Sequence, residues 1–169
     1  MTSQVLAVGV SNTVHILATA VWLGWSLALA LLVAPQVASA YGPEAAGWLA
    51  SAVRRVPPLA YLSLATLWVT GMVQLVANPN YVDLLALTND WSRLIFVKHL
   101  AVLASGGLIY YVGAVVAGEI GFQLRAATIG RGNEMRLAMA TRRFRLLAWL
   151  NLALSMIVLL MTGLATAIP

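Results

Sequence analysis

Four long apolar stretches, separated by segments rich in polar residues, proline and glycine, dominate the sequence. A helix rises about 1.5 Å per residue, so about 20 apolar residues cross a hydrocarbon layer about 30 Å thick. Each stretch reaches about that length, which predicts four membrane-spanning helices. We expect these spans at residues 5–34, 59–77, 94–118 and 146–168.

Helix-breaking residues set the expected ends of these spans. Pro35 predicts the end of the first span because proline has no backbone N–H, and Asn78-Pro79-Asn80 ends the second. Between them, residues 44–56 have apolar side chains at helical spacing and predict a short helix lying in the membrane interface. Gly130-Arg131-Gly132-Asn133 predicts the turn of a helical hairpin that carries the third and fourth spans beyond the membrane.

The composition agrees with a membrane protein of one domain over residues 1–169. Hydrophobic residues make up 62% of the chain and charged residues only 9%, whereas soluble domains carry about 25% charged residues. The chain has no cysteine, which excludes disulfides, iron–sulfur clusters, thiolate zinc sites and c-type haem attachment. The predicted fold class is therefore all-α, an integral membrane four-helix bundle.

The placement of charge predicts how the bundle is oriented. Eight of the ten basic residues lie in two connections, with Arg54 and Arg55 in the first and six arginines between residues 125 and 145 in the second. Cytoplasmic loops are rich in lysine and arginine, so we expect both connections, including the basic hairpin, in the cytoplasm of a bacterium. Both termini then lie outside the plasma membrane. This orientation explains the net charge of +5 without a nucleic-acid partner.

Each expected span carries one stripe of polar or small side chains. Residues three or four apart share a helix face, and polar side chains in lipid turn towards the interior of a bundle. The stripes are Asn12, His15, Thr19, Trp22 and Ser26; Ser63, Thr66, Thr70 and Gln74; His99, Gly106, Tyr110 and Gly113; and Asn151, Ser155, Thr162 and Thr166. They predict a common core, although small residues also simply let helices pack closely.

The two histidines, His15 and His99, are the main candidates for a functional site. An ionisable side chain within a span is costly and marks function. Each histidine lies about 20 residues, roughly 30 Å, from the inner end of its span. Because the first and third spans run in the same direction, both imidazoles are expected at one depth near the outer face. We predict that His15 and His99 hold one metal centre; two separate hydrogen-bonded histidines are the alternative.

Two imidazoles from facing helices are typical axial ligands of a low-spin haem b in a helical bundle. Gly24 and Gly106 are expected to make room for the porphyrin, with Trp22 on the same stripe as His15. Arg93 and Lys98 are the cations expected near its propionates. Lys98 has an alternative role, in which its ammonium simply extends from the lipid to the interface.

Copper is the competing occupant of the site. Cu(I) favours thioether and imidazole ligands, and among the six methionines Met72 and Met161 have a suitable depth. No carboxylate lies deep within an expected span, so a proton relay of acidic residues is not supported. The sequence has no phosphate-binding glycine loop and no hydrolytic motif, which disfavours nucleotide and hydrolytic chemistry.

Short motifs connect the chain to a known family. His15-x6-Trp22-x-Gly24 resembles the opening motif of the CopD-like membrane proteins of copper resistance, and Thr70-Gly71 and Trp91 followed by Lys98 are similar too. The related HemJ proteins, protoporphyrinogen oxidases that bind haem, share a first-span histidine and a third-span lysine. The resemblance covers most of the chain. It implies a bundle of four or more spans with its site near His15 and with Lys98 as a further site residue.

Three hypotheses follow. The first is a small haem b protein that passes electrons between an outer partner, either a quinone or a redox protein, and a second centre. The second is a CopD-like copper-binding or copper-transport protein. The third is a structural subunit of a larger membrane complex or a homo-oligomer without a centre of its own. The sequence assigns no enzymatic reaction.

Overall fold

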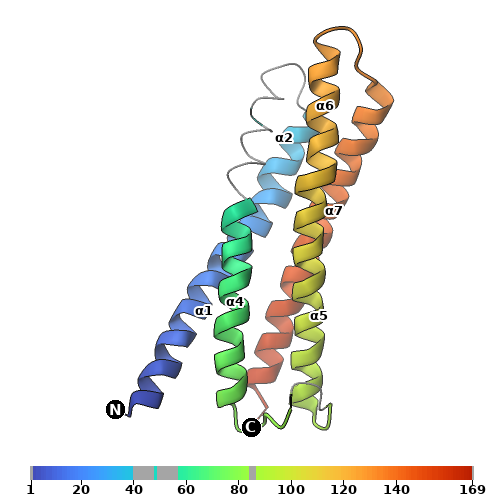
Figure 1. The fold of residues 1–169 in the computed structure, drawn as a ribbon. Coiled ribbons are helices and arrows are strands. Elements are labelled where there is room, and N and C mark those ends of the chain that lie inside the picture. The colour runs from blue at the N-terminus through green and yellow to red at the C-terminus, as the bar shows by residue number, and fades with distance from the viewer. Residues whose placement is uncertain (1, 40–47, 49–56, 84–86, 169) are drawn as a thin grey trace.

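A computed structural model of the protein describes residues 2–39, 48, 57–83 and 87–168 (Figure 1). These residues are helical or lie in turns and loops, and none of them forms a strand, so the all-α class is confirmed. Within the described residues, four helices are long and apolar enough to cross a membrane: Ser3–Val37, Pro58–Ala77, Asp90–Ala127 and Glu134–Thr166. The expected interfacial helix at residues 44–56 lies outside the described residues apart from Trp48.

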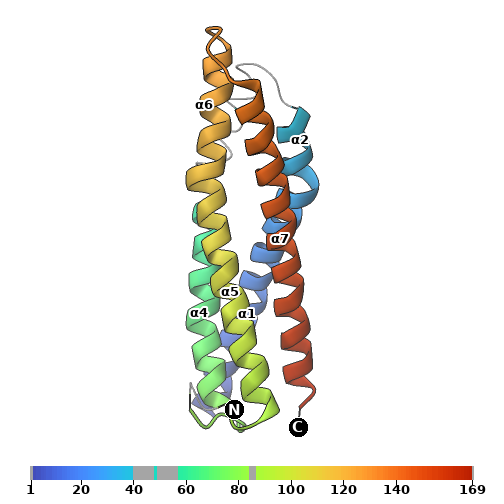
Figure 2. The ribbon, with the colours of Figure 1, turned by 90° about the vertical axis from the view of Figure 1, so that its right-hand side faces the viewer.

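The helices lie side by side along one long axis (Figures 1 and 2). Both termini are at one end, and the turn between α6 and α7 is at the other. α1 and α5 both run away from the end that holds the termini. The elements are α1 (Ser3–Ala28), η1 (Leu29–Val33), α2 (Ala34–Ser39), α4 (Pro57–Ala77), α5 (Asp90–Tyr111), η2 (Val112–Val116), α6 (Ala117–Ala127) and α7 (Glu134–Thr166).

The first helix does not end at Pro35, as the sequence predicted, but continues to Ser39. It passes the proline through a π-helical turn, η1, in which the Ala34 N–H bonds to the Leu29 carbonyl five residues back. In a regular α-helix the proline ring clashes with the carbonyl four residues before it. The wider turn directly before Pro35 displaces these carbonyls, which lets the helix continue.

The expected hairpin at the far end of the bundle is present. α7 has 33 residues, about 50 Å of helix, so it extends beyond a hydrocarbon layer about 30 Å thick. Gly130 has a φ of 69°, a left-handed conformation that favours glycine. A Cβ on Gly132 would lie 2.7 Å from Ala127 Cα, so this position also requires glycine. Asn133 then caps α7 by accepting from the Arg136 N–H at 3.0 Å.

The buried apolar side chains form clusters along the bundle. The largest surrounds Phe144 and contains residues of both π-helical turns, η1 and η2, packed against α7. The next surrounds Trp22, and a small one surrounds Trp91 near the end that holds the termini. The largest of these clusters therefore lies in the half of the bundle next to the hairpin (Figure 1).

A buried polar network joins α1, α5 and α7 between the two larger clusters. Its members, Ser26, Ser105, Asn151 and Ser155, are at most 1% exposed. Ser105 Oγ donates to Asn151 Oδ1 at 2.6 Å, and Asn151 Nδ2 donates to Ser26 Oγ at 3.0 Å. Such bonds between helices hold membrane bundles together because lipid offers no substitute partner.

Replacing Asn151 with alanine should lower the free energy of unfolding by about 1–2 kcal/mol, because Ser105 and Ser26 lose a buried partner. Denaturation of the purified protein in detergent would measure the change. Thr141→Ala is the matched control on the same helix, since the Thr141 hydroxyl bonds only to the Ala138 carbonyl of α7 itself. It should change stability by less than about 0.5 kcal/mol. Equal effects of the two substitutions would show that the network does not link the helices.

Candidate functional site

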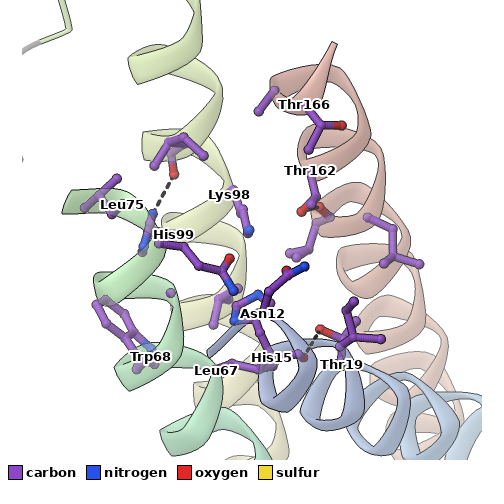
Figure 3. Close-up of a pocket in the computed structure, with 18 of the residues that line it drawn as sticks. Asn12, His15, Thr19, Leu67, Trp68, Leu75, Lys98, His99, Thr162 and Thr166 are labelled. Carbon is purple, nitrogen blue, oxygen red and sulfur yellow. Dashed lines mark hydrogen bonds between the residues drawn. The ribbon is translucent and has the colours of Figure 1, made fainter. Parts of the chain in front are cut away.

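A cavity of about 490 Å³ lies between α1, α4, α5 and α7, in the half of the bundle that holds the termini (Figure 3). This is within the range of about 300–1,000 Å³ that is usual for ligand pockets. Most of its wall is apolar, as expected for a pocket within a membrane protein. The polar or charged side chains along the wall are Asn12, His15, Thr19, Gln74, Asn78, Lys98, His99, Thr162 and Thr166.

His15 enters the cavity from α1 and is held by α4. Its Nδ1 lies 2.8 Å from Thr70 Oγ1, and Thr70 Oγ1 lies 2.6 Å from the Thr66 carbonyl. Because a carbonyl only accepts, the Thr70 hydroxyl donates its proton to Thr66 and accepts from His15. This network assigns the His15 proton to Nδ1 and leaves the lone pair on Nε2.

His99 enters the same cavity from α5 and has the same tautomer. Its Nδ1 lies 2.7 Å from the Ile95 carbonyl, one turn earlier in its own helix (Figure 3). Nδ1 must therefore be the donor, and Nε2 again keeps its lone pair. Trp68 of α4 packs against the imidazole edge to face, with ring centroids 5.3 Å apart and planes at 61°. The hydrogen bond and the Trp68 ring together restrict rotation of the His99 side chain.

Each of the two histidines has a hydrogen bond at Nδ1, a feature that is common among metal-ligating histidines. Metal-ligating histidines almost always donate their second ring nitrogen to a nearby acceptor, which fixes the tautomer and orients the ring. Both His15 and His99 have such an acceptor, and both line one cavity. Within the described residues, the Nε2 atoms of both histidines have no hydrogen-bond partner.

Four of the seven site residues expected from the sequence line the cavity: His15, Trp22, Lys98 and His99. The other three do not. Gly24 is two residues from Trp22, about 200° around the helix. Gly106 lies on the face of His99 but two turns deeper, where an added Cβ would be 3.6 Å from Leu64 Cδ1.

Arg93, the third of these, lies on another face of α5. Its guanidinium is exposed and pairs with Asp90 at 3.3 Å, and it also donates to the Leu87 carbonyl. The spacing of six residues between Arg93 and His99 corresponds to about 240° of rotation, which directs the two side chains apart. Of the two cations expected near the centre, only Lys98 therefore lines the cavity.

Two residues that support the histidines were not assigned a role from the sequence. Thr70 belongs to the polar stripe of its span, which is a signal that it faces the core, but its bond to His15 depends on how α1 packs on α4. Trp68 is off that stripe and 37% exposed, and no sequence pattern distinguishes it from a lipid-facing tryptophan. Both contacts join α4 to another helix: Thr70 contacts His15 of α1, and Trp68 contacts His99 of α5.

A smaller cavity of about 150 Å³ also has His99 in its wall. It shares part of its wall with the large cavity, including Trp68, Trp91 and His99. The rest of its wall is formed by Tyr81, Asp83, Ser92, Phe96, Leu100 and Leu103. His99 thus lines both cavities.

The side chains around the large cavity limit which metal centre fits. Among the described residues, no group of three or more His, Cys, Asp or Glu side chains could hold an ion. Among the described residues that line the cavity there is no methionine, so Met72 and Met161 do not complete a copper set of two imidazoles and a thioether. Two imidazoles in an apolar pocket fit a metal that brings its own equatorial ligands, as a porphyrin does.

Nitrogen-15 NMR of the histidine rings should show His15 and His99 as Nδ1–H tautomers in the unliganded protein. Thr70→Val removes the acceptor of His15 and should allow its proton to exchange between the two nitrogens. His99 should stay unchanged as an internal control. Ser11→Ala is the matched variant, because the Ser11 hydroxyl contacts only the Thr70 carbonyl, at 3.3 Å. A wild-type His15 protonated at Nε2 would contradict the assigned network.

Comparison with known proteins assigns no family. No protein-family model, no curated protein and no solved structure matches the chain. The resemblance to CopD-like and HemJ proteins therefore rests on the short motifs around His15, Trp22 and Lys98.

Proposed function

We propose that the protein binds haem b in its membrane-embedded cavity, with His15 and His99 as the axial ligands, and that it transfers electrons at the outer side of the membrane. The observation that carries the proposal is the pairing of two imidazoles on one cavity, each with Nδ1 already bonded. Both Nε2 atoms then have a lone pair available, and neither histidine must change tautomer to bind iron.

The cavity suits the remaining parts of such a ligand. Its wall is mainly apolar, which matches the porphyrin ring, and all four long helices contribute to it. Thr70 and Ile95 hold the two imidazoles, and Trp68 keeps the His99 ring in place. Bound haem would supply one-electron redox chemistry, which the side chains of this chain do not provide themselves.

The charge distribution supports an orientation for this activity. Six arginines of the α6–α7 hairpin, at positions 125, 131, 136, 142, 143 and 145, are exposed. By the positive-inside rule this end is cytoplasmic, so the termini and the cavity lie towards the outer face of a bacterial plasma membrane. The electron partner is then a quinone in the outer leaflet or a redox protein outside. The smaller aromatic cavity beside His99 offers a place where the ring of a quinone could approach the centre.

Purified protein reconstituted with haem b should show the reduced-minus-oxidised bands of a low-spin bis-histidine cytochrome. His15→Gly and His99→Gly should each remove this spectrum, because each removes one axial donor. Added imidazole should restore it by filling the space of the missing ring, which separates loss of ligation from loss of folding. Ser11→Ala, one turn before His15 and outside the cavity wall, is the control and should keep the wild-type spectrum.

Three outcomes would contradict the proposal. Unchanged bands in both glycine variants would remove His15 and His99 as ligands. Purified protein with stoichiometric copper and no haem, and with less copper after His15→Ala, would favour the CopD-like hypothesis. Protein without metal or chromophore that co-purifies with other membrane subunits would favour a structural subunit.

The acceptor of His15 provides a second and quantitative test. Thr70→Val should weaken haem binding by about 10–100-fold, the usual effect of removing the hydrogen-bond partner of a metal-ligating histidine. Titration of the apoprotein with haem, followed by absorbance, would measure the change. Thr66→Val is the matched control, since the Thr66 hydroxyl bonds to the Leu62 carbonyl and only its backbone carbonyl contacts Thr70. Equal affinities for the Thr70 variant and the control would refute the role of Thr70.

A further inference from the structure

Lys98 brings a positive charge to the wall of the large cavity without a negative partner. The described residues that line this cavity include no aspartate or glutamate. Elsewhere in the described part of the chain, the one ion pair joins Arg93 to Asp90. Figure 3 shows Lys98 pointing from α5 into the cavity, so its ammonium does not extend along the lipid face of the helix.

Gln74 of α4 adds an unused hydrogen-bond donor to the same wall. Its Nε2 is buried and has no hydrogen-bond partner, and the residue lines the cavity together with Lys98. Buried polar groups are normally hydrogen-bonded, and each exception needs an explanation. A bound ligand that accepts a hydrogen bond is such an explanation.

The threonine hydroxyl groups around the cavity do not add free hydrogen-bond donors to it. Thr19 donates to the His15 carbonyl at 2.8 Å, and Thr162 donates to the Val158 carbonyl at 2.7 Å. Their protons are therefore used within their own helices. Asn12 of α1 has its amide on the cavity side (Figure 3). The wall thus includes Lys98 and the amide side chains of Asn12 and Gln74, and no aspartate or glutamate among the described residues that line it.

We propose that Lys98 and Gln74 form a carboxylate-binding subsite in the large cavity. An unpaired ammonium in apolar surroundings is costly, and a ligand carboxylate removes this cost while it accepts charge-assisted hydrogen bonds. The remaining wall is apolar, so the ligand class is an amphiphile with an apolar body and an acidic group. The identity of that ligand as haem, bound through a propionate, rests on the proposed function; the carboxylate chemistry does not.

The test compares a carboxylated ligand with its ester. Metal-free protoporphyrin IX and its dimethyl ester have the same ring and no iron, so their binding does not require axial ligation. Both would be titrated into detergent-solubilised protein, with quenching of tryptophan fluorescence as the readout, because Trp22, Trp68 and Trp91 line the cavity. The acid should bind at least about 10-fold more tightly than the ester, the size expected for a hydrogen bond to a charged group.

Variants then assign this preference to the subsite. Lys98→Met keeps the length of the side chain and removes its charge, so the ratio of the two dissociation constants should fall to about 1. Gln74→Leu should lower the ratio in part. Arg93→Met is the matched control, since it removes a cation of the same helix outside the cavity wall; it should keep the wild-type ratio. Each porphyrin partitions into the detergent to the same extent with every variant. Comparing the ratio of dissociation constants between variants therefore cancels this effect.

Competition separates two sources of the carboxylate. Displacement of protoporphyrin by oleate, but not by methyl oleate, would assign the subsite to carboxylated lipids in general, whereas no displacement would restrict it to porphyrins. Equal binding of acid and ester to the wild-type protein, or an unchanged ratio in Lys98→Met, would overturn the subsite. Because haem ligation is read from the spectra of the histidine variants, either proposal can fail while the other stands.

Discussion

An apolar solvent is the constraint on which this structure depends. Lipid offers no hydrogen-bond partners, so the polar groups of the spans have to be satisfied within the bundle. The network around Asn151 meets this requirement completely, with bonds to α1 and α5. Three buried nitrogen atoms among the described residues have no hydrogen-bond partner: Trp22 Nε1, Trp25 Nε1 and Gln74 Nε2. Trp22 and Gln74 line the same cavity as His15, His99 and Lys98, whereas Trp25 does not.

The two halves of the bundle have different interiors. Near the hairpin, both π-helical turns pack against α7 around Phe144 and form an apolar core. Near the termini, the same helices surround a cavity of about 490 Å³. The core around Phe144 and the Asn151 network thus link the helices on the hairpin side of the cavity.

The two histidines are held by different means for the same result. The acceptor of His15 is on a neighbouring helix, which makes its orientation depend on the packing of α1 against α4. The acceptor of His99 is one turn away in its own helix, and Trp68 of α4 supports the ring from the side. α4 thus contributes to both imidazoles although it carries no candidate ligand itself.

The sequence by itself determined the helical class, the four long apolar helices, the α6–α7 turn and the candidate role of His15 and His99, because hydrophobic length, helical period and glycine turns are local properties. The prediction that the first helix ends at Pro35 was wrong. A π-helical turn that lets a helix continue past a proline cannot be recognised from the types of residue in it. Only the tertiary structure decided that Lys98 lines the cavity and that Gly106, on the same face as His99, does not. Which donors keep a partner depends on how neighbouring helices rotate and approach, and packing alone sets that geometry.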